Sequence, residues 1–77
     1  MMMKNIKQTI TQILLDIGLV ESQITEEADL IYDLGLDSLE FAEIIMVIEE
    51  RFQISIPNKD WGKIHTVKDI VNYLEEK

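Results

Sequence analysis

The hydrophobic residues near the start of the chain recur with the spacing of an α-helix. Five aliphatic side chains follow one another at steps of four, three, one and three residues, namely Ile6, Ile10, Ile13, Leu14 and Ile17. This spacing places them on one helical face and predicts a helix from about Met3 to Ile17. Gly18 predicts its end, because glycine readily takes the left-handed conformation that often closes a helix.

Residues 19–37 lose this periodicity, and their hydrophobic residues are scattered among acids. The apolar positions of this segment are Val20, Ile24, Leu30, Leu34 and Leu36. We expect a long loop that places these side chains in the core. A loop of this length inside a compact domain is unusual and tends to be functional.

A second helix is predicted from Ser38 to Phe52, with a strong signal at its start. Asp37 is a favourable N-cap, and the side chain of Glu40, three residues on, can accept a hydrogen bond from the N–H of the cap. The residues expected to face the core are Phe41, Ile44, Ile45, Ile48 and Phe52.

The segment after this helix is expected to be extended and then to make one helical turn. Ile54 and Ile56 alternate, and the residue before Pro57 is disfavoured in helical geometry. The short turn should run from Asn58 to Gly62, with Asn58 as its cap.

The last helix is predicted from about Val67 to Glu75. Thr66 is its expected N-cap, Asp69 completes the capping pair, and the inner face consists of Val67, Ile70, Val71 and Leu74. Together these elements predict an all-α fold, a small four-helix bundle of three main helices and one short helix, with a long loop between helices 1 and 2. Without repeats or a linker, residues 1–77 are expected to form a single domain.

The composition limits what such a chain can do. A chain of 77 residues buries only about 60% of its unfolded surface, which leaves little room for a deep catalytic cleft. The chain has no cysteine, and its apolar runs are far shorter than the roughly 20 residues of a membrane span. We expect a cytoplasmic monomer that neither catalyses a reaction nor enters a membrane.

The charge is unevenly distributed. The net charge is −8, yet residues 16–50 hold eleven carboxylates and no Lys or Arg. Such a segment repels nucleic acid and attracts basic patches on proteins. A solubilising acidic coat is the alternative explanation.

Ser38 is the first candidate for chemistry. It falls at the first position of the predicted second helix, where backbone N–H groups lack partners and the helix dipole favours an anion. A phosphate on its hydroxyl would be well placed there. A serine that merely starts a helix is the ordinary alternative.

The outer side of the second helix carries a second candidate site. Leu39, Ala42 and Met46 point away from the predicted core and are flanked by Glu43, Glu49 and Glu50. An apolar strip bordered by acids is typical of a surface that docks a basic protein. The alternative is that Leu39 and Met46 pack under the long loop.

Other chemistry has weaker support. His65 is the single histidine and is expected in a solvent-facing turn, and Trp61 is expected to cover an edge of the core. Residues 29–40 space their acids somewhat like an EF-hand, but Ile31 and Leu34 stand where a ligand and a glycine are required. We expect no metal centre, although loose divalent binding by neighbouring carboxylates stays open.

The whole chain resembles the acyl carrier protein family. The stretch Asp33-Leu34-Gly35-Leu36-Asp37-Ser38-Leu39-Glu40 is similar to the family's L-G-x-D-S-L signature. Ile54-Ser55-Ile56-Pro57 looks like its I-x-I-P stretch, and the segment 64–74 is similar to its lead into the final helix. Similar residues also recur along the second helix, namely Glu43, Met46, Glu49, Glu50 and Phe52.

The resemblance implies a specific chemistry. A phosphopantetheinyl transferase would use coenzyme A to attach 4′-phosphopantetheine to Ser38, with Asp37 and Leu39 beside the attachment site. The thiol of this arm would hold acyl groups as thioesters, which the bundle would shelter by opening between its helices. Synthases and acyl-transferring enzymes would place their own basic patches against the outer side of the second helix. The residues that they would contact are Glu40, Ala42, Glu43, Met46, Glu49 and Glu50.

Three residues depart from the family pattern, namely Phe41, Arg51 and Trp61. They leave open a housekeeping fatty-acid carrier and a dedicated carrier of one pathway, such as a polyketide or other specialised carrier. An aminoacyl carrier for cell-wall modification also stays open. Peptidyl carriers are disfavoured by Leu36-Asp37. Two readings from other classes are an acidic interaction subunit that is never modified and, more remotely, a hydrolase with Ser38 as its nucleophile.

Overall fold

The computed structural model describes residues 5–76, and this part of the chain is helical. Its elements are α1 (Asn5–Asp16), the 3₁₀-helix η1 (Glu21–Gln23), α2 (Ser38–Phe52), α3 (Asn58–Trp61) and α4 (Val67–Glu75). Within residues 5–76 there is no strand, and β-type pairing is limited to an isolated bridge between Asp29 and Thr66. The predicted all-α bundle of three main helices and one short helix is confirmed.

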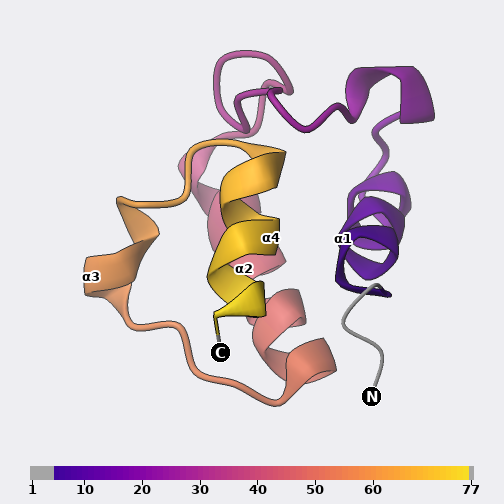
Figure 1. Cartoon of the computed structure of the whole chain (residues 1–77). Coiled ribbons are helices and arrows are strands. Elements are labelled where there is room, and N and C mark those ends of the chain that lie inside the picture. The colour runs from indigo at the N-terminus through magenta and orange to yellow at the C-terminus, as the bar shows by residue number, and fades with distance from the viewer. Residues whose placement is uncertain (1–4, 77) are drawn as a thin grey trace.

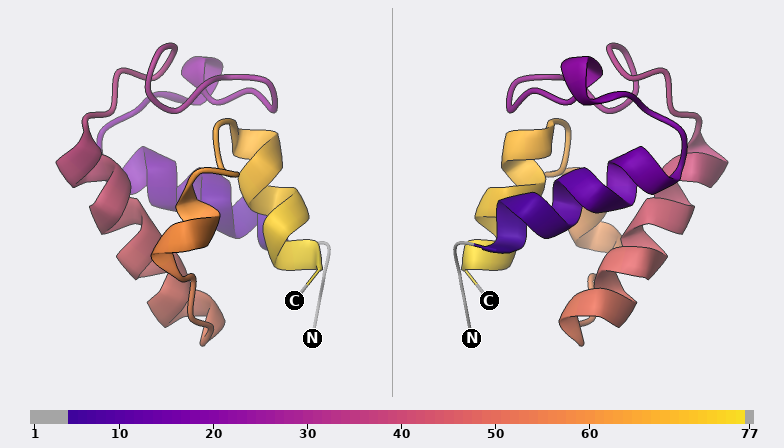
Figure 2. Two further views of the ribbon diagram at one scale, coloured as in Figure 1. Left: turned by 90° about the vertical axis from the view of Figure 1, so that its left-hand side faces the viewer. Right: turned by 90° about the vertical axis from the view of Figure 1, so that its right-hand side faces the viewer.

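The three longer helices enclose the core. α1 packs against both α2 and α4, and Figure 1 shows α4 in front of α2 with α1 to one side. α3 lies on the side away from α1, and the long loop crosses one end of the bundle in every view (Figures 1 and 2). The second helix therefore has one face toward the bundle and one away from it.

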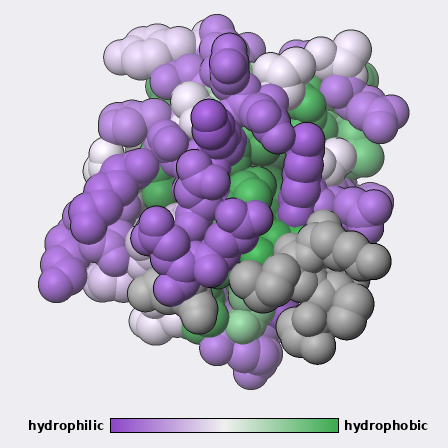
Figure 3. Space-filling view, in the orientation of Figure 1, coloured by the Kyte–Doolittle hydropathy of each residue, from purple (hydrophilic) through white to green (hydrophobic). Residues whose placement is uncertain are grey.

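The core is aliphatic. No polar or charged side chain is buried in the described part of the chain, and on the face seen in Figure 3 hydrophilic residues cover most of the surface, with hydrophobic ones visible between them. Burial of aliphatic side chains is the main source of stability in such a small bundle. The buried residues are Ile6, Ile10, Ile13, Leu14, Ala28, Leu30, Leu34, Leu36, Ile44, Ile45, Ile48, Ile56, Ile64, Val67, Ile70 and Leu74.

The first helix ends at a glycine, as predicted. Gly18 has a positive φ of 114°, and its N–H and that of the next residue donate to carbonyls of the last turn at 3.0 and 3.2 Å. These paired bonds form a Schellman motif. Because α1 already ends at Asp16, the prediction that Ile17 belongs to the helix is wrong. Ile17 is 41% exposed, whereas the other four residues assigned to its face are buried. The predicted start at Met3 lies outside the described residues.

The long loop places most of its apolar side chains in the core, as predicted. Leu30, Leu34 and Leu36 are buried and Ile24 is half-buried. Val20 is the exception at 55% exposed, because it precedes η1, a short helical turn that the sequence did not predict and that lies outside the bundle. Its N–H is held by the side chain of the last residue of η1 at 2.9 Å.

The loop is also bonded to the start of α4. The Leu30 N–H donates to the His65 carbonyl at 2.8 Å, and the N–H groups of Val67 and Lys68 donate to loop carbonyls at 3.2 and 2.8 Å. N–H groups in the first turn of a helix have no partner within it. The loop carbonyls satisfy two of them, which fixes the loop on the bundle.

The second and last helices have the predicted bounds, whereas the predicted cap of the short helix is wrong. Asn58 is the first residue of α3, and Pro57 is the N-cap without a side-chain bond. The extended backbone of Pro57 leaves its carbonyl free to accept the Asp60 N–H at 2.9 Å. Backbone geometry thus starts this helix, and no side-chain cap is needed.

Candidate functional site

Ser38 lies directly after a fully formed helix cap. Asp37 has an extended backbone and its Oδ1 accepts the Glu40 N–H at 2.8 Å, while Glu40 Oε1 accepts the Asp37 N–H at 3.1 Å. The predicted capping box is therefore present. It fixes the direction in which α2 leaves the loop and hence the position of Ser38.

Two backbone N–H groups remain unpaired at this point. No acceptor among residues 5–76 receives the N–H of Ser38 or Leu39, and the regular helical series begins with Phe41 donating to the Asp37 carbonyl at 2.9 Å. Ser38 is itself exposed. Unpaired amides at the start of a 15-residue helix favour a nearby anion. An exposed hydroxyl beside them fits a phosphodiester.

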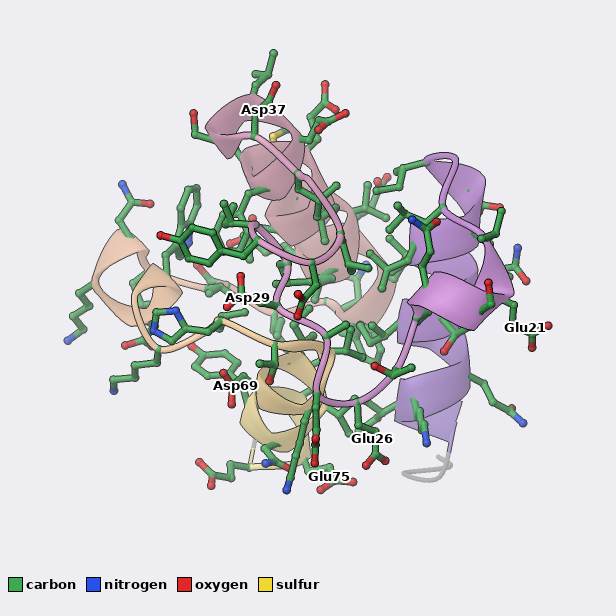
Figure 4. The ribbon with its side chains drawn as sticks, turned by 90° about the horizontal axis from the view of Figure 1, so that it is seen from above. Glu21, Glu26, Asp29, Asp37, Asp69 and Glu75 are labelled. Carbon is green, nitrogen blue, oxygen red and sulfur yellow. The ribbon has the colours of Figure 1, made fainter. Side chains whose placement is uncertain are left out.

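The loop before Ser38 has side chains in the core on both sides of Gly35. Gly35 takes a positive φ of 74°, where a side chain would strain the backbone. On either side of it Leu34 and Leu36 are buried, and the Leu36 N–H donates to the Leu30 carbonyl at 3.1 Å. Gly35 thus allows the backbone turn that places Ser38 at the surface. Figure 4 shows the neighbouring Asp37 at the outer edge of the molecule, where α2 begins.

Two acids of the loop have a structural role that the sequence analysis missed. Asp29 Oδ1 accepts the N–H groups of Ile31 and Tyr32 at 3.0 and 2.9 Å, and Asp33 Oδ2 accepts the Asp29 N–H at 2.7 Å. Together they close the turn that leads to Gly35. The sequence does contain a signal for this turn, because Asp29 and Asp33 stand four residues apart just before Gly35. Asp side chains commonly accept hydrogen bonds from nearby backbone N–H groups.

The outer side of α2 is apolar and acidic. Leu39 and Met46 are 68% and 64% exposed, so neither packs under the loop. Ala42 between them is half-buried, and Glu40, Glu43 and Glu50 are exposed. The structure thus brings these residues to one surface.

Glu49 differs from the other acids of α2. It is half-buried, and its Oε2 accepts the Ile56 N–H at 2.7 Å. This bond ties the segment between α2 and α3 back to α2. Glu49 therefore has a structural role in addition to the docking role predicted for it.

Two of the three departures from the family pattern contact each other. The rings of Phe41 and Trp61 meet edge to face, with centroids 5.8 Å apart and an interplanar angle of 72°. Trp61 is half-buried, as expected for a residue at the edge of the core, and its Nε1 donates to the Ile56 carbonyl at 3.1 Å. The third departure, Arg51, pairs with Asp16 at 3.9 Å and so links α2 to the end of α1.

The acids of the central segment do not converge on one point. Figure 4 shows Glu21, Glu26, Asp29 and Asp37 well separated, and within residues 5–76 no three His, Cys, Asp or Glu side chains form a metal-binding group. Glu26 pairs with Lys7 at 3.0 Å, and this hydrogen bond holds the pKa of the Glu26 carboxyl below its usual value. His65 is exposed, as expected.

An interaction between α3 and α4 also escaped the sequence analysis. The Tyr73 hydroxyl donates to Asp60 Oδ2 at 2.6 Å. This bond raises the pKa of Tyr73 to about 12 and lowers the pKa of Asp60. Thirteen residues separate the two, so no local pattern indicates the pair.

The fold and the exposed serine at a helix start define a small helical carrier domain. The family described as phosphopantetheine attachment site matches residues 8–74. The acyl carrier protein of Thermotoga maritima is 49% identical over 61 residues, which cover 79% of this chain and 75% of that protein. The chain therefore belongs to the acyl carrier proteins, the family that carries 4′-phosphopantetheine.

Membership of this family establishes the general activity. The chain is a carrier rather than an enzyme: it bears a covalent 4′-phosphopantetheine and interacts with synthase and acyltransferase enzymes. In residues 5–76 no helix has the length and apolar character needed to cross a membrane.

Proposed function

We propose that Ser38 is the residue that carries the arm, in fatty acid or related acyl biosynthesis. The observation that carries this proposal is the exposed Ser38 hydroxyl beside the unpaired N–H groups of residues 38 and 39. When bound, 4′-phosphopantetheine supplies a thiol that holds acyl groups as thioesters. The protein's part is to present the hydroxyl to the transferase and to place the phosphodiester where a helix favours negative charge.

The intact mass of the protein tests this proposal. Incubation with coenzyme A and a broad-specificity phosphopantetheinyl transferase should add one phosphopantetheinyl group to the wild type and none to Ser38→Ala. The matched control is Ser55→Ala, which removes another exposed serine outside the helix start and should gain the full mass. A modified Ser38→Ala protein would contradict the assignment.

We further propose that partner enzymes dock on the outer side of α2. Exposed apolar side chains at residues 39 and 46 would supply the contact, and the carboxylates of residues 40, 43, 49 and 50 would steer basic patches toward it. Asp37 would set the geometry of the attachment site, and Leu39 would form its apolar border.

Salt dependence tests the electrostatic part of this proposal. Raising the ionic strength from about 0.01 to 1 M shortens the Debye length from about 30 to 3 Å. The KM of the transferase for this protein should rise several-fold over that range. Its kcat should change less, because screening acts on encounter rather than on the chemistry at Ser38. A KM that is insensitive to salt would contradict charge-guided docking.

Three further expectations about the chain stay predictions. We expect it to be a monomer, to act as a single domain and to work in the cytoplasm. Sedimentation, limited proteolysis and cell fractionation test them in turn. An unmodified interaction subunit is the alternative function, and no observation favours it.

A further inference from the structure

The short helix α3 is held on the bundle by few contacts. α1 packs closely against α2 and α4, whereas α3 has no comparably close packing with another helix in the described part of the chain. Among residues 5–76 no backbone hydrogen bond joins α3 to α1, α2 or α4. The side of the bundle where α3 lies, away from α1 (Figures 1 and 2), is therefore closed by side chains.

Trp61 is central to this closure. It is the one hydrophobic residue of the four in α3, and it packs against the core. Its ring meets that of Phe41 on α2 with centroids 5.8 Å apart, and its Nε1 donates to the Ile56 carbonyl at 3.1 Å. Beside it, Asp60 accepts the hydroxyl of Tyr73 on α4 at 2.6 Å. Two neighbouring side chains of α3 thus connect it to both α2 and α4.

The aromatic pair, Phe41 and Trp61, lies close to the proposed attachment site. Phe41 comes three residues after Ser38, which is about 4.5 Å along the axis of α2. A phosphopantetheine arm is flexible and much longer than one helical turn. An acyl group at the end of an arm on Ser38 can therefore reach the side of the bundle that the aromatic pair closes.

We infer that the aromatic pair determines specificity and limits this carrier to short or polar acyl groups. An acyl chain leaves water completely only by entering between helices, and α3 forms the least closely packed boundary of the bundle. A chain that enters there takes the place of the Trp61 ring. This inference rests on the proposed attachment at Ser38 and names the class of acyl group that the arm would carry.

The contacts of Trp61 oppose such an entry. Displacing its ring separates it from Phe41 and breaks the hydrogen bond from its Nε1 to the Ile56 carbonyl. Losing an aromatic contact and leaving two polar groups without partners are both unfavourable. Each methylene of an acyl chain gains only a small free energy on burial. A short chain therefore remains in water, and a polar group has no reason to enter.

The fluorescence of Trp61, the one tryptophan of the chain, tests whether an acyl chain displaces the ring. A broad-specificity phosphopantetheinyl transferase would load the wild type from coenzyme A, acetyl-coenzyme A or octanoyl-coenzyme A, with intact mass as the check on each product. The emission maximum should be the same in all three forms, because the ring keeps its contacts. A shifted maximum in the octanoyl form alone would overturn the inference.

Thermal unfolding tests whether the chain is buried. The acetyl and octanoyl forms of the wild type should melt at the same temperature. In Trp61→Ala, which makes room beside Phe41, the octanoyl form should melt about 4–8 °C above the acetyl form. The matched control is Tyr32→Ala, which removes an exposed aromatic ring of the loop and should behave as the wild type. Equal stabilisation of the wild type and Trp61→Ala by the octanoyl chain would contradict the inference.

A milder variant keeps the test decisive if Trp61→Ala does not fold. Phe41→Leu removes the ring contact, keeps a hydrophobic side chain on α2 and leaves Trp61 as the reporter. Octanoyl loading should shift the emission of Phe41→Leu and not that of the wild type, and an unchanged emission in the variant would show that the pair does not control entry. A wild type that gains no arm from any of the three coenzymes would instead contradict attachment at Ser38, and its unchanged mass identifies that failure before any chains are compared.

Discussion

The two sides of α2 carry similar hydrophobic residues with opposite exposure. On the inner side Ile44, Ile45 and Ile48 are almost completely buried, whereas on the outer side Leu39 and Met46 have most of their surface in water. Neighbouring elements cover one side and leave the other uncovered. The same helix thus separates residues that hold the fold together from residues available to partners.

The acids of the central segment divide in the same way. Asp29, Asp33 and Glu49 accept backbone hydrogen bonds of 2.7 to 3.0 Å within the protein, whereas Glu43 and Glu50 are exposed on the outer side of α2. The net charge of the chain does not distinguish these two groups of carboxylates. Their contacts indicate that some of these carboxylates also hold the fold together.

The largest expected effect comes from truncating the inner side of α2. Ile48→Ala should lower the free energy of unfolding by about 2–5 kcal/mol, because it removes buried methyl groups and leaves a cavity. Met46→Ala on the outer side should change it by less than about 0.5 kcal/mol, since the side chain is exposed. Urea denaturation followed by circular dichroism measures both values.

The milder variant Ile48→Val keeps this comparison measurable if Ile48→Ala does not fold. It should cost about 0.5–1.5 kcal/mol. An outer-side truncation as destabilising as the inner one would contradict the division of α2 into two sides.

Charge reversal on α2 should separate the structural acid from the exposed one. Glu43→Lys should weaken partner binding without loss of stability. Glu49→Lys should also destabilise the fold by about 1–3 kcal/mol, because the Ile56 N–H loses its acceptor. Denaturation and transferase KM values on the two variants measure the difference, and equal stabilities would show that the Glu49 bond contributes little.

A destabilising change far from α2 should leave docking intact. Thr66→Ala removes the side-chain cap of α4, whose Oγ1 accepts the Asp69 N–H at 3.1 Å, and should cost about 1 kcal/mol. The transferase KM should equal that of the wild type at temperatures where the variant is folded. A raised KM would mean that stability, rather than the outer surface of α2, governs partner binding.

The smallest expected effect concerns the Tyr73–Asp60 bond and its dependence on pH. The pKa of Asp60 in the folded protein lies below its ordinary 3.8. The stability that the bond to Tyr73 contributes is therefore present above pH 3.8 and is lost as the pH falls through the folded pKa. The pKa of Tyr73 is raised from 10.0 to about 12, so the contribution is present below pH 10 and is lost as the pH rises toward 12.

Comparison with Tyr73→Phe measures this contribution. The melting temperature of the variant should fall below that of the wild type between about pH 5 and 9, and the gap should narrow at both extremes. A gap that is independent of pH would show that the hydroxyl stabilises the fold in some other way.

The sequence predicted those features that depend on local patterns. The bounds of α2 and α4 follow from Asp37 and Thr66 with their capping partners, and the end of α1 follows from Gly18. Such signals act over three or four residues and are visible without the fold. The exposure of Leu39 and Met46 followed in the same way from helical periodicity.

The features that were missed depend on segments distant in the sequence or on the exact path of the chain. Periodicity alone placed Ile17 on the helical face that holds Ile13 and Leu14, although α1 ends before Ile17 and leaves it exposed. The contact of Tyr73 with Asp60 and the closing bonds of the loop on α4 join distant segments.

Attachment of the arm at Ser38 is tested most directly by locating the arm on the polypeptide. The modified wild-type protein would be digested and its peptides fragmented in a mass spectrometer. We expect the phosphopantetheinyl group on Ser38 and on no other residue. Finding it on Ser22 or Ser55, the other serines of the chain, would contradict the claim that the exposed hydroxyl at the start of α2 is the attachment point.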